Sequence, residues 1–188
     1  METPVQPPNS TKVATKWAVI YTLTSIIITY AMQLTNTSPD SPVKYLSYIP
    51  FIGFLLLAQK EFRDELGGYM SFGNGFSAGF RYAVFAGLML GVFTYIYFAI
   101  LSPAVWNQIV EVSRAKIQET NKNLTDEQVD KAIDITRKYG PVFGGFGAAI
   151  GSAVSGAVFS LIGAAIFKKE RSPYDIAENA IDPNENNS

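Results

Sequence analysis

The chain has 188 residues, a formal net charge of −1 at pH 7, and neither cysteine nor histidine. Without these two residues it has no disulfide, no thiolate nucleophile and no zinc–thiolate site, and it lacks the commonest general base. We therefore expect no catalytic residue, no metal site, no cofactor and, at this near-neutral charge, no nucleic-acid partner.

Charged residues are nearly excluded from four apolar stretches, and Arg81 is the single charged residue in them. These stretches are residues 17–34, 45–59, 76–101 and 141–167. Three of them reach the roughly 17–25 residues that a helix needs to cross a hydrocarbon core about 30 Å thick. The sequence therefore predicts an all-α integral membrane protein with four transmembrane helices.

The N-terminal segment, residues 1–16, is polar and rich in proline, and we expect it to be a flexible tail. Lys12 and Lys16 precede the first apolar stretch as in a signal peptide. That stretch is longer than the usual apolar region of about 7–15 residues, and no A-x-A cleavage site follows it. We expect an uncleaved first span at about 17–34.

The second span is the shortest by its uncharged residues. Ser41-Pro42 is typical of a helix start, so we expect a helix over 42–62 with Lys44 and Lys60 reaching toward opposite interfaces. Pro50 should kink it near its middle. A buried helix that does not span is the alternative for this segment alone.

A glycine-rich segment, "ELGGYMSFGNGFSAGFRY", leads into the third span at about 76–101. Residues 73–78 satisfy the loose dinucleotide-binding pattern G-x-G-x-x-G/A. However, that pattern functions after a β-strand and with an acidic residue about 20 positions later, and both are missing here. We interpret the glycines as a turn at the membrane surface.

Small residues recur every four positions through the third and fourth spans. Such ridges let two helix backbones approach closely in lipid, where burying large side chains gives little drive for association. Bulky residues shifted by two positions should face lipid. We expect the two spans to pack on each other within one chain, with self-association between chains as the alternative. The packing residues are Gly79, Ala83, Gly87 and Gly91 in the third span, and Gly144, Ala148, Ser152, Gly156, Ser160 and Ala164 in the fourth.

Two groups of polar residues lie within the predicted spans. A charge at the depth of Arg81 is a possible functional residue. The simpler interpretation is that its side chain reaches the interface or pairs with Asp64 or Glu65. Three hydroxyls share one face of the first span and are expected to bond across helices, or alternatively to line a polar path: Thr22, Ser25 and Thr29.

Residues 103–139 form an amphipathic helical segment between the third and fourth spans. Ser102-Pro103 should begin its first helix, and a capping box of Thr125 and Gln128 its second. Tyr139-Gly140-Pro141 is expected to end the second helix before the last span, 141–167. The resulting hairpin should lie on the membrane surface against the bundle, or alternatively dock a partner protein.

The basic pair Lys168-Lys169 marks a membrane boundary, and the acidic tail 169–188 is expected to be disordered. An even number of spans places both termini on one side. Basic residues in the short flanking segments favour the side of the termini, whereas including residues 103–139 makes the totals equal. We expect both termini in the cytoplasm.

At these residues the chain resembles a family of small bacterial membrane proteins, mostly from Bacteroidetes, known as domain-of-unknown-function family 4199. The resemblance rests on "ELGGYMSFGNGFSAGF", the aromatic third span before Ser102-Pro103, "LTDEQVDKAIDITRKYGP", and the small-residue span that ends in Lys168-Lys169. It implies an inner-membrane location and four spans, and it brings no catalytic residue or cofactor.

Two functions remain open from the sequence. The first is a non-enzymatic scaffold or accessory subunit that associates with itself or with a membrane partner through its helices. The alternative is a small-solute or ion transporter or channel that acts as an oligomer. A single intramembrane charge argues against transport, and an intramembrane hydrolase lacks the residues it would need.

Overall fold

The computed structural model describes residues 8–37 and 42–170, and this part of the chain is helical apart from its connections. The all-helical class is therefore confirmed for these residues. Residues 1–7 and 171–188 lie outside the described part, and they include less than half of the predicted N-terminal tail and most of the predicted C-terminal tail. The helices in chain order are α1 (Ser10–Leu34), η1 (Pro42–Ser47), α2 (Tyr48–Glu65), α3 (Phe72–Ile96), η2 (Tyr97–Leu101), α4 (Pro103–Thr120) and α5 (Asp126–Phe167).

Local side chains explain where several helices begin. Asn9 caps α1, and its side chain accepts a hydrogen bond of 2.9 Å from the backbone N–H of Thr11, so the helix begins seven residues before the predicted span. The predicted capping box of Thr125 and Gln128 is confirmed at the start of α5. Gly67 and Gly68 both have positive φ, a conformation that glycine adopts without strain, and they turn the chain from α2 into α3.

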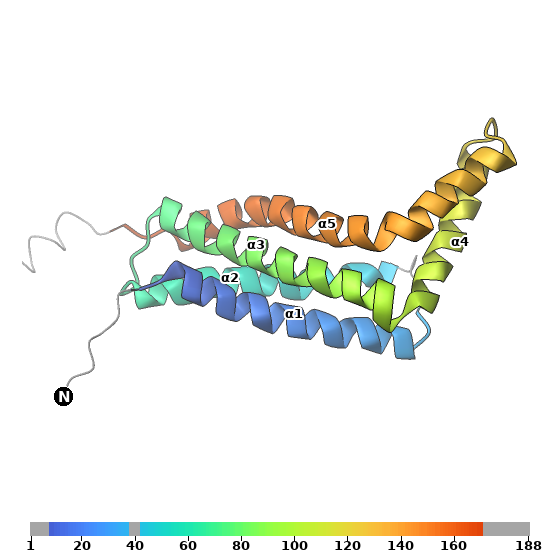
Figure 1. Cartoon of the computed structure of the whole chain (residues 1–188). Helices are drawn as coiled ribbons and strands as arrows, with labels where there is room; N and C mark the ends of the chain where they lie inside the picture. Colours follow the sequence, from blue (N-terminus) through green and yellow to red (C-terminus); the bar gives the residue numbers. More distant parts are fainter. Residues whose placement is uncertain (1–7, 38–41, 171–188) are drawn as a thin grey trace, which may run out of the picture.

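Four helices lie side by side along most of the molecule (Figure 1). The most extensive contact is between α3 and α5, followed by that between α1 and α3, while α2 packs against α1, α3 and α5. The start of α1 and the end of α5 lie at the same end of the bundle (Figure 1). The chain therefore runs up and down, with both described ends of the chain on one side.

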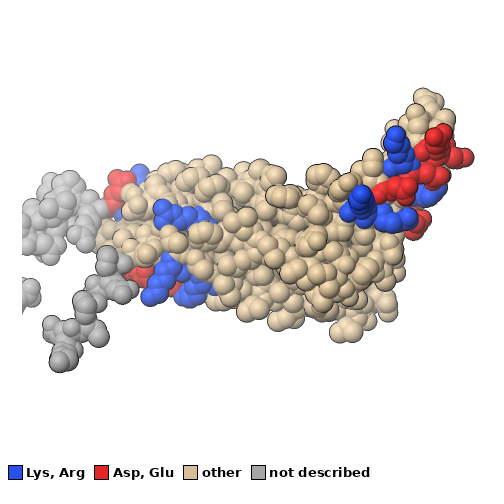
Figure 2. Space-filling model, viewed as in Figure 1, with Lys and Arg blue, Asp and Glu red and all other residues tan. Residues whose placement is uncertain are grey.

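Three helices are long and apolar enough to cross a membrane: Ser10–Leu34, Phe72–Leu101 and Asp126–Phe167. The helix α2 is not among them, because Lys60, Glu61, Arg63, Asp64 and Glu65 occupy its last turns. Figure 2 shows charged side chains at the two ends of the molecule and a broad uncharged band between them. Large apolar side chains are exposed on this band, as lipid contact requires.

Pro50 was expected to kink the second helix near its middle, but it lies near the start of α2. Residues 42–47 form a 3₁₀-helix, and the α-helix begins only at Tyr48. Pro50 therefore lies in the first helical turn, where its missing N–H would have had no helical partner.

Glycine permits the close approach of α3 and α5. A Cβ atom on Gly87 would lie 2.8 Å from the Cβ of Ser152, and one on Gly156 would lie 2.0 Å from the Cβ of Ala83. A Cβ on Gly91 would lie 2.6 Å from the backbone oxygen of Gly145. The bulky residues of α5 point away from this contact and are exposed: Phe146, Ile150, Val154, Val158, Ile162 and Ile166.

The contact follows the predicted every-four row near the end of α5, where Ala164 lies against Gly75 and Ser160 against Gly79. It departs from that row nearer Pro141. There Gly145 and Ala149 lie against α3, whereas a Cβ on Gly144 would have only the methyl group of Thr94 within 4 Å, at 3.8 Å. A row of residues four apart rotates by about 40° per step around a helix of 3.6 residues per turn, so a straight contact moves from one row to the next.

We expect Gly156→Ala to lower the stability of the protein and Gly147→Ala to leave it unchanged. The new methyl group at position 156 would overlap Ala83, which costs about 1–3 kcal/mol, whereas a Cβ on Gly147 has nothing within 4 Å. Thermal unfolding of the two purified variants in mild detergent measures the difference. Equal midpoints would contradict the packing.

Candidate functional site

A buried amide connects three helices in the bundle. Gln59 of α2 is fully buried, and its Nε2 donates hydrogen bonds of 2.9 Å to the backbone oxygens of Gly75 and Ser160. The room for this amide comes from two glycines. A Cβ on Gly79 would lie 2.7 Å from Nε2, and one on Gly163 would lie 1.9 Å from Oε1. The amide thus fixes α2 against both α3 and α5.

Two atoms of this polar cluster remain without a hydrogen bond, the Oε1 of Gln59 and the Oγ of Ser160. An unsatisfied polar atom in an apolar interior costs free energy, so the cluster stabilises the fold only through the two bonds that it makes. Gln59 was not predicted as a site residue, because it ends an apolar stretch and its position in the sequence does not reveal its partners. The one signal in the sequence was a single amide side chain, Gln59, at the end of an apolar stretch and directly before the charged residues Lys60 and Glu61.

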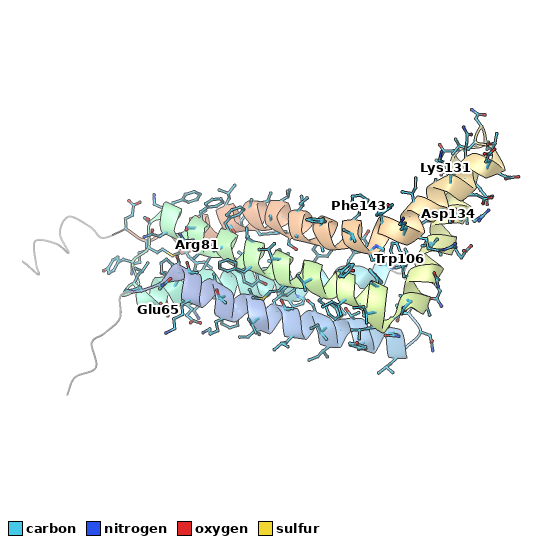
Figure 3. The ribbon with its side chains drawn as sticks, viewed as in Figure 1. Glu65, Arg81, Trp106, Lys131, Asp134 and Phe143 are labelled. Carbon is cyan, nitrogen blue, oxygen red and sulfur yellow. The ribbon has the colours of Figure 1, made fainter. Side chains whose placement is uncertain are left out.

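Arg81 lies at the end of the bundle where the described chain begins and ends (Figure 3). Its Nη1 donates to the hydroxyls of Ser10, at 2.6 Å, and Thr11, at 3.0 Å, in the first turn of α1. These hydroxyls, rather than the expected Asp64 or Glu65, are its partners in the structure. Its side chain is exposed, so Arg81 acts as a link between α3 and α1 near the surface.

The same end carries a second link, between α1 and α2. Lys16 forms an ion pair with Glu61, and the indole N–H of Trp17 donates to the same carboxylate at 2.9 Å. The predicted hydroxyl face of α1 does not provide such links. Thr22 and Thr29 each donate to a backbone oxygen four residues earlier in α1 rather than to another helix.

At the opposite end, α1 is tied to the junction between α3 and α4. The hydroxyl of Tyr97 donates to Oε1 of Gln33 at 3.1 Å, and Nε2 of Gln33 lies 3.3 Å from the hydroxyl of Ser102. Tyr97 and Ser102 flank a π-helical turn, η2, which follows α3 directly. The backbone N–H of Ser102 donates a hydrogen bond of 2.7 Å to the backbone oxygen of Tyr97 across this turn. Insertions of this kind commonly mark functional positions.

The predicted end of a helix at Tyr139-Gly140-Pro141 is wrong, because α5 continues through it. Proline at position 141 removes the N–H that would bond to the backbone oxygen of Arg137. The indole N–H of Trp106, on α4, donates to that oxygen at 3.2 Å. The indole can come so close because residue 140 is glycine, where a Cβ would lie 2.0 Å from the ring. A side chain far away in sequence therefore replaces the missing bond.

We call residues 103–140 the arm, which comprises α4 and the first part of α5. Its helices pack around a small core of Val110, Val129 and Ile133. Ion pairs join them across the arm, Arg114 with Asp130 and Arg137 with Glu111. The arm extends beyond the end of the bundle at an angle to it (Figure 1). The sequence suggested a hairpin on the membrane surface that lies against the bundle. Figure 3 places Trp106 at the base of the arm and Lys131 and Asp134 further out.

Within residues 8–37 and 42–170, no three acidic side chains gather as they would around a metal ion. The two features that distinguish this bundle are thus the amide of Gln59 and the joint at Trp106. The fold defines an all-helical protein with three helices able to cross a membrane.

The chain belongs to the family described as Protein of unknown function (DUF4199), whose model matches residues 16–169. The match ends close to the Met70–Lys169 bridge that joins the end of α5 to the turn before α3. No curated protein and no solved structure matches the chain significantly.

We expect Gln59→Glu to destabilise the protein more than Gln59→Met does. Methionine loses two hydrogen bonds at a cost of roughly 1 kcal/mol. Glutamate loses the same two bonds and also places a carboxyl group without a partner in an apolar interior. Thermal unfolding of the two variants in mild detergent at pH 8 measures the difference. Equal losses of stability would contradict the buried position.

We expect Trp106→Phe to loosen the arm without unfolding the bundle. Phenylalanine keeps a ring against Gly140 but cannot donate to the oxygen of Arg137. Because the chain has no cysteine, spin labels at Gln118→Cys and Lys60→Cys report the angle of the arm by electron-spin resonance. The distance distribution should broaden in Trp106→Phe and stay narrow in Tyr139→Phe. An unchanged distribution would show that the indole bond does not hold the joint.

Proposed function

We propose that this protein is a four-span inner-membrane protein without enzymatic activity that acts as a scaffold or accessory subunit, with the arm as its docking element. The observation that carries the proposal is the joint at Trp106, which holds a pair of helices clear of the bundle. An arm needed only to connect two spans would require neither a core nor a hydrogen-bonded base.

The packing of α2 supports its assignment as the fourth span. Phe51, Leu55 and Ala58 are buried in the same core as α1 and α3. Its charged end lies near Lys16, since Glu61 pairs with that residue. The helix α2 runs alongside the other helices (Figure 1) and packs against α1, α3 and α5, so it would occupy the same depth of the bilayer.

The distribution of basic residues supports a cytoplasmic position for both termini. At the end of the bundle where the described part of the chain begins and ends, the basic residues are Lys12, Lys16, Lys60, Arg81 and Lys168. At this end the basic residues lie in short segments, which weigh most in membrane orientation. The arm would then extend on the outer side of the membrane.

The glycine contact bears on how such a protein could associate. The closest-packed small residues of α3 and α5 are occupied by each other within one chain. They are therefore not free to form an interface with a second copy or with a membrane partner. A partner would therefore have to bind a surface that is not already used in the packing of the bundle. Among these surfaces, the arm extends furthest from the bundle.

Site-specific photo-crosslinking tests the proposal with two matched positions. Ile135 on the arm and Ile162 on the bundle have 52% and 50% of their surface exposed. With benzoylphenylalanine at each position in the full chain in its native membrane, we expect Ile135 to yield one discrete protein adduct and Ile162 to yield lipid adducts. The adduct at Ile135 should weaken when Trp106→Phe is added, because the arm loses its fixed direction.

Native electrophoresis of mildly solubilised membranes provides the second measurement. The chain should migrate in a complex larger than its monomer. A bare monomer with no protein adduct at Ile135 would contradict the scaffold function.

A further inference from the structure

A cavity of about 230 Å³ lies inside the bundle, between α5 and the other long helices. Tyr21 of α1 and Tyr48 of α2 form one wall. The other wall is a strip of small residues on α5, Gly147, Gly151, Ser152 and Ser155. The cavity lies in the half of the bundle nearer the arm, because these residues follow Pro141 by two to four turns.

The cavity exists because small residues occupy this side of α5 without being packed. A Cβ on Gly147 or Gly151 would have nothing within 4 Å, unlike one on Gly87, Gly91 or Gly156. The strip is therefore separate from the glycine contact between α3 and α5. Tyr48, the first residue of α2, is exposed beside it, so the space is open at this side.

The lining is apolar over the larger part of its area, with Phe51 and Leu90 completing it, and it carries no charge. Its polar residues are two tyrosines and two serines, and none of its residues is ionised at neutral pH. A mostly apolar lining with a few polar groups is typical of sites for small molecules. Tyr21 is only 4% exposed, so this tyrosine is enclosed within the bundle. Hydroxyl groups inside a membrane bundle favour water or a hydrogen-bonding guest over a hydrocarbon chain.

We infer that this cavity is a water-filled binding site for small, neutral, hydrogen-bonding molecules such as alcohols and amides. Its volume exceeds the roughly 30 Å³ that one water molecule takes up in the liquid by several-fold, and it is smaller than the about 300–1,000 Å³ of typical drug-sized sites. Ions are excluded because no charged side chain is present to compensate their lost hydration. The inference rests on the four-span arrangement proposed above.

Single cysteines test it directly, because the chain contains none. Ser155→Cys places a thiol in the cavity with little change in size, and the neighbouring Val154→Cys places one on the outward, lipid-facing row. Only the hydrated thiolate reacts with methanethiosulfonates. With neutral methyl methanethiosulfonate on the full chain in lipid vesicles, we expect Ser155→Cys to react at least about tenfold faster than Val154→Cys.

Two further comparisons test whether the thiol lies in this cavity and whether the cavity excludes charged molecules. Gly151→Leu, which has free space at its Cβ, should fill the cavity and slow the reaction of Ser155→Cys about tenfold. The cationic trimethylammonium-ethyl reagent should react at Ser155→Cys far more slowly than at Gln118→Cys on the arm, once each rate is divided by that of the neutral reagent.

The contradicting results are distinct. If Ser155→Cys is as unreactive as Val154→Cys, the cavity is not hydrated and the inference fails. If the cationic reagent reacts freely there, the site does not exclude ions; if Gly151→Leu changes nothing, the thiol does not lie in this cavity. Either result overturns the inference. If Val154→Cys reacts as fast as Ser155→Cys, the placement of α5 in the bilayer fails instead.

Discussion

The helices α3 and α5 lie backbone to backbone, and the rest of the bundle is arranged around this contact. At Gly91 and Gly145 even one methyl group would overlap the backbone oxygen of the opposite helix. Such an approach matters in a bilayer because lipid chains are as apolar as leucine, so burying large side chains gains little. Dispersion contacts between closely spaced backbones supply the stabilisation instead. The bulky side chains of α5 are consequently left facing outward.

The same contact creates the two polar features of the bundle. Gln59 reaches the backbone oxygens of α3 and α5 together only because these two helices are close to each other, and because Gly79 and Gly163 leave space for its amide. At the other end, α5 continues beyond the bundle into the arm, so the arm is a direct extension of the tightly packed helix. Its joint depends on Trp106 and Gly140, which restore the bond that Pro141 removes.

The sequence predicts most of the helical architecture because charge segregation and end-capping residues are local signals. Ser102-Pro103, Thr125 and the apolar stretches needed no tertiary information. The continuation of α5 through Pro141 could not be predicted, because the compensating donor is 31 residues away in sequence. The role of Gln59 was missed for the same reason. The sequence predicted a row of small residues on α5, but the rotation of that row around the helix brings in Gly145 and Ala149, which a strict spacing of four omits.

Isotope-filtered nuclear Overhauser spectroscopy tests the central claim, that α3 and α5 of one chain pack through glycine. The methyl group of Ala149 lies beside Gly91, so labelled alanine methyls should show contacts to the α-protons of Gly91 in a sample of uniformly labelled chains. In a mixture of labelled and unlabelled chains, a filter that selects contacts between molecules should remove this signal. A signal that survives the filter, or its absence from both samples, would contradict the account.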